Sequence, residues 1–122
     1  MISYVTLGTN DLARATAFYD ALLGEMGATR MMQTDRMVIW SAQMGAPMLA
    51  VCTPYDGKAA TVGNGTMVAL AARDRETAAR VHAKALELGG SDEGAPGPRG
   101  DGFYGGYFRD VDGNKLVACV FG

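Results

Sequence analysis

The sequence predicts an α+β protein made of two consecutive β-α-β-β-β modules. Three observations predict this fold class: an internal repeat, a strand-turn-helix pattern at the start of each copy, and strand-like segments joined by turns in the remainder. A chain of 122 residues is long enough for one compact domain with its own core. We therefore expect a single domain, residues 1–122, in which module 1 spans residues 1–60 and module 2 spans residues 61–122.

The repeat becomes visible when the chain is shifted by 63 residues, which aligns residues 4–27 with residues 67–90 without a gap. Like residues then coincide along the whole segment: Val5 with Val68, Leu7 with Leu70, Asp11 with Asp74, Ala15 with Ala78, Leu23 with Leu86 and Gly27 with Gly90. Two segments that match so closely predict the same local structure in both halves.

Each copy begins with a short apolar strand, expected at residues 2–7 and 66–71. A polar turn follows, in which an Asp is placed to accept backbone N–H bonds at the start of a helix. Apolar residues at helical spacing come next, and Gly27 and Gly90 are expected to end the two helices.

The rest of each half predicts strands. In the first half we expect them at residues 37–42 and 47–53, with a further strand near residues 31–36. In the second half we expect them at residues 105–110 and 115–121. Asp112 and Gly113 join this last pair and favour a type I′ hairpin turn. The late strands repeat at 67 residues because the second half has a longer Gly-rich segment, residues 91–106, which we expect to form a loop.

Composition narrows the classes of function. A net charge of −2 without long charge runs predicts neither nucleic-acid binding nor attraction to an anionic membrane. No segment approaches the ~20 apolar residues of a membrane span, and the start of the chain lacks the pattern of a signal peptide. Two cysteines do not make a disulfide framework. We expect a cytoplasmic protein with free thiols.

Three segments, in order, resemble the vicinal oxygen chelate superfamily of glyoxalase I, bleomycin-resistance proteins and extradiol dioxygenases. They are YVTLGTNDLARATAFYDALLG, GNGTMVALAA and DEGAPGPRGDGFYGGYFRDVDGNKL. The resemblance covers nearly the whole chain and implies two modules whose curved sheets enclose a cleft. It also implies a homodimer, as is common for chains of this length in the family, often with exchange of modules. The sequence leaves open which pairing applies.

The resemblance further implies where a divalent metal would bind: to His, Gln or Glu on the first and last strands of each module. Here those four positions hold Tyr4, Ala50, Met67 and Val117. Ala and Val offer no donor atom, Met offers a weak soft sulfur, and a neutral Tyr phenol is a poor ligand. We therefore expect no bound metal, no cofactor and no catalytic residue of the metal-dependent kind.

Other candidate sites have plain structural alternatives. The Asp110-to-Asn114 turn resembles the start of an EF-hand loop, but Gly113 falls at the fourth position instead of the sixth, so a hairpin turn is the better interpretation. His82 lies in the second helix without a neighbouring acid in its own turn, which favours a packing role. Cys52 and Cys119 are repeat partners that share strand faces with Ala50 and Val117. They are small buried residues or, with a cationic neighbour, reactive thiols.

These observations predict a metal-free family member that binds or sequesters a small apolar or aromatic molecule. Tyr4 would orient the ligand, and Arg99 would clamp an acidic group or, alternatively, pack on its own loop. The expected cleft residues are Tyr4, Trp40, Met48, Ala50, Cys52, Met67, Arg99, Tyr104, Tyr107, Val117 and Cys119. The alternatives are a glyoxalase- or dioxygenase-like enzyme (a lyase or oxidoreductase) with an altered active site, and a structural protein whose cleft is filled by side chains.

Overall fold

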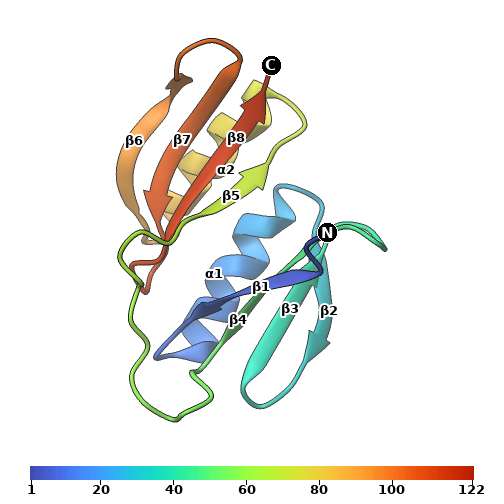
Figure 1. Ribbon diagram of the computed structural model, residues 1–122, viewed down its shortest axis with the longest axis vertical. Helices are drawn as coiled ribbons and strands as arrows, with labels where there is room; N and C mark the ends of the chain where they lie inside the picture. The colour runs from blue at the N-terminus through green and yellow to red at the C-terminus, as the bar shows by residue number, and fades with distance from the viewer.

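A computed structural model describes all residues, 1–122, and shows two four-stranded sheets, each with one helix (Figure 1). The elements follow the chain in the order β1 (Tyr4–Gly8), α1 (Leu12–Gly24), β2 (Thr29–Gln33), β3 (Met37–Ser41), β4 (Met48–Cys52), β5 (Val68–Ala71), α2 (Arg75–Glu87), β6 (Ser91–Pro98), β7 (Phe103–Arg109) and β8 (Lys115–Phe121). The β-α-β-β-β pattern therefore occurs twice, and the predicted fold class is confirmed.

The two sheets share one topology. The first has the strand order β1-β4-β3-β2 and the second β5-β8-β7-β6. In each sheet the first and last strands of the module are parallel neighbours, and the remaining pairs are antiparallel. Thr6 pairs with Ala50 in the first sheet, and Ala69 pairs with Val117 at the equivalent place in the second. The two repeat offsets read from the sequence therefore describe the true three-dimensional equivalence.

Both helices begin as the sequence predicts. The Asp11 carboxylate accepts a hydrogen bond from Arg14 N at 3.1 Å, and the Asp74 carboxylate accepts one from Thr77 N at 2.7 Å. The first helix ends near Gly27, which has a φ of +78°. The second does not end at Gly90 as predicted, because the left-handed residue there is Gly89, with a φ of +101°. Gly90 is instead required for close packing, since a Cβ there would lie 2.4 Å from the Arg109 carbonyl oxygen.

Most of the Gly-rich segment lies in strands, so the prediction of a loop across residues 91–106 was wrong except at the turn of residues 99–102. Residues 91–98 form β6 at the edge of the second sheet, paired with β7 and interrupted by two register shifts beside Gly94. An edge strand tolerates proline because half of its backbone N–H groups need no partner in the sheet. Bulges absorb the extra residues. Composition alone masks such a strand, because its glycines and prolines indicate a turn.

The turn between β7 and β8 differs from the predicted type I′ geometry. That type needs a positive φ at two residues, whereas only Gly113 has one, at +91°. Gly113 N donates to the Asp110 carbonyl at 3.0 Å, and Asp110 N donates to the Asn114 carbonyl at 2.9 Å. A three-residue loop closed by a left-handed glycine follows from these bonds.

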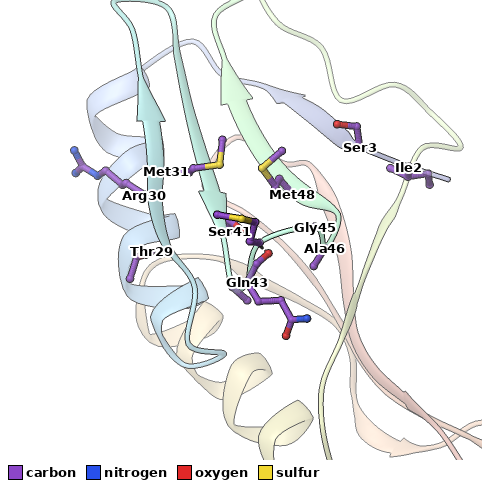
Figure 2. Close-up of a pocket in the computed structure, with 12 residues that line it drawn as sticks. Ile2, Ser3, Thr29, Arg30, Met31, Ser41, Gln43, Gly45, Ala46 and Met48 are labelled. Carbon is purple, nitrogen blue, oxygen red and sulfur yellow. Dashed lines mark hydrogen bonds between the residues drawn. The ribbon is translucent and has the colours of Figure 1, made fainter.

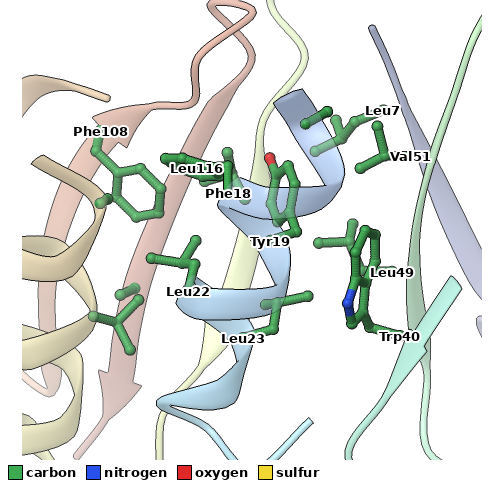
Figure 3. Close-up of a cluster of buried hydrophobic side chains, with 14 of the residues drawn as sticks. Leu7, Phe18, Tyr19, Leu22, Leu23, Trp40, Leu49, Val51, Phe108 and Leu116 are labelled. Atoms are coloured by element: carbon green, nitrogen blue, oxygen red, sulfur yellow. The ribbon is translucent and has the colours of Figure 1, made fainter. Parts of the chain in front are cut away.

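One hydrophobic core spans both modules. Figure 3 shows α1 between the two sheets, with Phe18 and Leu22 directed toward Phe108 and Leu116 of module 2. On its other side the helix meets the inward side chains of the first sheet, including Leu7, Leu49 and Val51. Burying a large apolar side chain stabilises a fold by about 1.5–3 kcal/mol. The helices therefore lie on the core side of the two sheets. The opposite face of each sheet has no covering helix (Figure 1).

Neither helix is long and apolar enough to cross a membrane. Each contains thirteen residues, short of the ~20 that a span needs.

Candidate functional site

The uncovered face of the first sheet, here called open face 1, carries four of the predicted site residues. Tyr4 pairs with Met48, and Ala50 and Cys52 follow at alternate positions of β4. Alternation along a strand directs these four side chains away from α1. Tyr4 remains about half exposed (48%), whereas Ala50 is fully shielded by its larger neighbours. Open face 1 also carries Thr6, Met32, Met37, Ile39 and Ser41.

The uncovered face of the second sheet, open face 2, carries the equivalent set. Val117 and Cys119 alternate along β8, Tyr107 pairs with Val117 from β7, and Met67 immediately precedes β5. Met67 is 42% exposed, and Val117 is buried beneath side chains of its own face. A methyl-sized group at Gly105 would lie 3.0 Å from the Val117 side chain, so the sheet surface is tightly filled here. Phe103 and Phe121 lie edge to face at one end of this surface.

The two open faces do not meet within one chain. The shared core lies between the sheets on their helix-facing sides, and the extensive strand-to-strand contacts are all within one sheet or the other. Tyr4 and Met67 therefore belong to separate surfaces of the protomer, and a cleft that contains both needs a second copy of the chain.

Two predicted site residues lie elsewhere. Trp40 is 1% exposed and points into the core (Figure 3). Its Nε1 donates a hydrogen bond to Asp20 at 2.9 Å. Its partner on β4 is Leu49, so it occupies the helix-facing side of the sheet. Tyr104 packs against the core from β7, with the Arg75 guanidinium 5.1 Å from its ring centre. The strand register therefore corrects our placement of both residues in the cleft.

Arg99 folds back over the second sheet. Its Nη2 donates to the Ala95 carbonyl at 2.6 Å, and its guanidinium carbon lies 5.6 Å from the centre of the Tyr107 ring. The side chain passes over Gly94 and Gly97, where a Cβ would lie 3.3 and 3.2 Å from its terminal nitrogens. The absence of side chains at these two glycines gives the guanidinium room to lie close to the strand. Arg99 therefore lies over open face 2 and also packs on its own segment.

Lys115 also lies on open face 2, although it was not among the cleft residues expected from the sequence. Its Nζ lies 5.6 Å from the Tyr107 ring centre, the same separation as that of Arg99. Lys115 precedes Val117 by two residues on β8, so both side chains share open face 2. The sequence contained this information, because strand alternation places a residue two positions before Val117 on the same face of the sheet.

The two thiols lie on separate faces. Cys52 is half-buried on open face 1, and Cys119 is buried on open face 2. Burial raises the pKa of the Cys119 thiol, because the charged thiolate is poorly solvated there. Low reactivity at neutral pH follows for Cys119.

His82 has an acidic partner that the sequence did not reveal. Its Nε2 lies 3.0 Å from Asp92 Oδ1 and 3.1 Å from the Tyr107 carbonyl oxygen. Asp92 comes from β6, the strand expected to be a loop. A backbone N–H bond from Gly94, and then the contact with His82, lower the pKa of the Asp92 carboxyl. The histidine is buried between α2 and β7, in a packing position that no open face reaches.

The residues at the family's metal positions do not fit a metal ion. Tyr4, Ala50, Met67 and Val117 supply no carboxylate and no imidazole, and the last strands Met48–Cys52 and Lys115–Phe121 contain no acidic residue. Nowhere in the chain do three or more His, Cys, Asp or Glu side chains gather closely enough to hold a metal ion. Hard divalent cations need oxygen or nitrogen donors, so these surfaces cannot supply the ligand set.

A hollow of about 450 Å³ lies beside open face 1, where the sheet meets the β3–β4 loop (Figure 2). Its walls carry three thioethers, from Met31, Met44 and Met48. Met48 belongs both to this hollow and to open face 1, so the two features are continuous. Thioether side chains adapt to ligands of different shapes.

Comparison with known proteins agrees with this fold and repeat. Residues 1–117 match the Glyoxalase/Bleomycin resistance protein/Dioxygenase superfamily, and the chain belongs to that superfamily. The structure of a glyoxalase/bleomycin resistance protein from Albidiferax ferrireducens T118 is similar over 100% of this chain and 99% of its own, with 36% identity and a TM-score of 0.92.

More distant structures share the fold. A glyoxalase-related enzyme from Fulvimarina pelagi is 21% identical, covers 98% of this chain and 87% of its own, and has a TM-score of 0.78. A lactoylglutathione lyase from Agrobacterium tumefaciens is also 21% identical, covers 98% and 92%, and has a TM-score of 0.72. No functionally curated protein matches the chain.

Proposed function

We propose that the protein binds a small, largely apolar or aromatic molecule without the help of a metal ion. The observation that carries this proposal is the replacement of the whole metal-ligand set by Tyr4, Ala50, Met67 and Val117 at equivalent places of the two sheets. Members of the superfamily typically bind small molecules. Apolar walls with a few polar groups are typical of such sites.

In this proposal the binding surface combines both open faces. Its residues are Tyr4, Met48, Ala50 and Cys52 from open face 1, and Met67, Arg99, Tyr107, Val117 and Cys119 from open face 2. Tyr4 orients the ligand through its phenol, and the methionines form an adaptable wall. Trp40 and Tyr104 are left out because they face the core.

The proposal includes a homodimer in which open face 1 of one protomer meets open face 2 of its partner. Its support is the exposure of large apolar side chains on both faces, Tyr4 and Met32 on the first and Met67 and Phe121 on the second. Apolar surface that is left in contact with water favours association. Because the helices separate the two faces within a protomer, only a partner can bring them together.

Sedimentation velocity tests the dimer. The wild type is expected at twice the mass of the chain, and Met67→Glu is expected to shift the population toward monomer, since it places a charge in the proposed interface. Leu86→Glu is the matched control, because Leu86 is exposed on α2, away from both open faces. A monomeric wild type, or equal dissociation by both variants, would contradict the proposal.

A thermal-shift screen tests ligand binding. A ligand that binds only the folded state must raise the melting temperature, and the shift grows with the ratio of free ligand concentration to the dissociation constant. We expect uncharged or singly charged aromatic compounds to raise the melting temperature of the wild type, and to do so less for Met67→Ala, which removes apolar contact area without adding a charge. Absence of any stabilising compound would favour a structural role.

Elemental analysis of the purified protein tests the metal-free part. We expect well below one equivalent of Zn, Ni, Mn or Fe per chain, because the donor atoms are missing. A stoichiometric metal that is lost in Tyr4→Phe or Met67→Leu would instead support an enzyme of the metal-dependent kind.

A further inference from the structure

Open face 2 carries two cations beside one aromatic ring. Tyr107 lies on β7, between β6 and β8 in the strand order. Arg99 approaches its ring from the β6 side, and Lys115 approaches from β8, each with its charged group 5.6 Å from the ring centre. An aromatic ring attracts cations through its electron-rich face, so the three groups form one unit.

Neither cation has an acidic partner. The hydrogen bonds of Arg99 go to two neutral carbonyl oxygens, those of Ala95 and Pro98, and Lys115 takes part in no ion pair. The nearby Arg109, by contrast, is paired with Glu93 at 3.0 Å. Two uncompensated positive charges on one surface are notable in a chain whose net charge is −2.

The surface proposed to face these cations supplies no compensating charge either. Open face 1 consists of Tyr4, Thr6, Met32, Met37, Ile39, Ser41, Met48, Ala50 and Cys52, none of which is acidic. Bringing the two faces together would remove water from Arg99 and Lys115 without giving them a counter-charge. Such desolvation is unfavourable unless an anion is present.

We infer that the ligand is an organic anion, an apolar or aromatic body carrying one acidic group that lies between Arg99 and Lys115 over Tyr107. Arg99 has N–H groups beyond those it donates to carbonyls, and Lys115 has three donors, so both can bond a carboxylate or sulfonate. The edge of the Tyr107 ring and the exposed Met67 side chain would contact the apolar body. This inference rests on the proposed small-molecule function and specifies the class of ligand.

A matched pair of fluorescent probes tests the inference: anilinonaphthalene sulfonate, which is anionic, and N-phenylnaphthylamine, the same ring system without the sulfonate. Fluorescence titrations at low salt give the dissociation constant of each probe. For the wild type we expect tighter binding of the anionic probe, and we expect added salt to weaken only that probe.

The variants Arg99→Gln and Lys115→Gln are each expected to weaken the anionic probe by about 3- to 10-fold, the usual range for losing one charge-assisted contact at a partly exposed site. The uncharged probe should change by less than about twofold. Lys115→Arg should retain anion binding, since it keeps the charge. Lys58→Gln removes an equal charge from the exposed linker and serves as the control.

Each other outcome overturns a defined part of the argument. If both probes weaken equally in Lys115→Gln, the residue acts through packing and the anion site is refuted. If Lys58→Gln has the same effect as Lys115→Gln, only the net charge of the protein matters, and the site is again refuted. If the wild type binds only the uncharged probe, the small-molecule function stands and the anionic class fails. If it binds neither probe, the proposed function fails as well.

Discussion

The phenol of Tyr19 donates a 2.6 Å hydrogen bond to Asp110 Oδ2, and this buried contact joins the helix of module 1 to the last hairpin of module 2. The other carboxylate oxygen of Asp110 accepts from the backbone N–H groups of Asp112 and Asn114, both at 2.9 Å. Asn114 Nδ2 then donates to the Gly8 carbonyl at the end of β1. The turn therefore has two roles: it closes a hairpin, and it attaches one module to the other.

Replacing Tyr19 by Phe should weaken this attachment. The phenylalanine ring would still fill the space beside Phe18 and Trp40. The buried carboxylate of Asp110, however, would lose the hydrogen bond that the Tyr19 hydroxyl donates. A hydrogen bond to a charged group contributes about 1.5–3 kcal/mol. We expect the free energy of unfolding, measured by urea titration, to fall by about that amount. A change below about 0.5 kcal/mol would mean that the contact between the modules does not depend on this bond.

Alkaline pH should weaken the same contact. Burial, and after it the charge of Asp110, raises the pKa of Tyr19 well above its ordinary value. The unfolded phenol ionises near pH 10 and the folded one does not, so the stabilisation is fully present below about pH 10 and is lost as the pH rises above it. Urea titrations between about pH 8 and 11 should show a steeper loss of stability for the wild type than for Tyr19→Phe. Parallel curves would contradict this assignment.

The repeat was the most informative part of the sequence. It placed Ala50 and Val117 at equivalent positions of separate sheets, and the pairings of Thr6 with Ala50 and of Ala69 with Val117 confirm that equivalence. Period-two alternation then put Cys52 and Cys119 on the same faces. These inferences hold because the two repeats form sheets with the same strand order, so residues at equivalent repeat positions occupy equivalent places.

The remaining errors have local causes. The side of the sheet to which Trp40 points depends on the register between β3 and β4. The sequence of the loop between these strands does not determine that register. The strand β6 was missed because its glycines and prolines indicate a turn, although bulges and an edge position accommodate them. The partner of His82 was missed with it, since Asp92 lies on that strand.

Trp40→Phe should separate stability from binding. The variant removes part of a fully buried side chain and its hydrogen bond to Asp20, which predicts a loss of about 1–3 kcal/mol in the free energy of unfolding. Probe binding at the open faces should remain within about twofold of the wild type, because Trp40 lies on the opposite side of the sheet. Tyr4→Ala, an open-face variant, is the converse control and should weaken probe binding with little effect on stability. Loss of probe binding in a folded Trp40→Phe would return Trp40 to the site.

Gly106→Ala tests the packing of α2 on the second sheet. A Cβ at this position would lie 3.0 Å from His82 Cδ2 and 3.0 Å from Pro96 Cγ, two rings with little freedom to move. Overpacking of this kind costs about 1–3 kcal/mol, which urea titration would measure as a lower free energy of unfolding. Gly24→Ala is the matched control, because a Cβ there meets nothing within 4 Å at the end of α1 and should leave stability unchanged or raise it. The double variant His82→Ala/Gly106→Ala should lose less free energy of unfolding than the two single variants lose in total, because removing the His82 side chain makes room for the new methyl group. Strictly additive losses would show that the strain at residue 106 does not arise from the histidine.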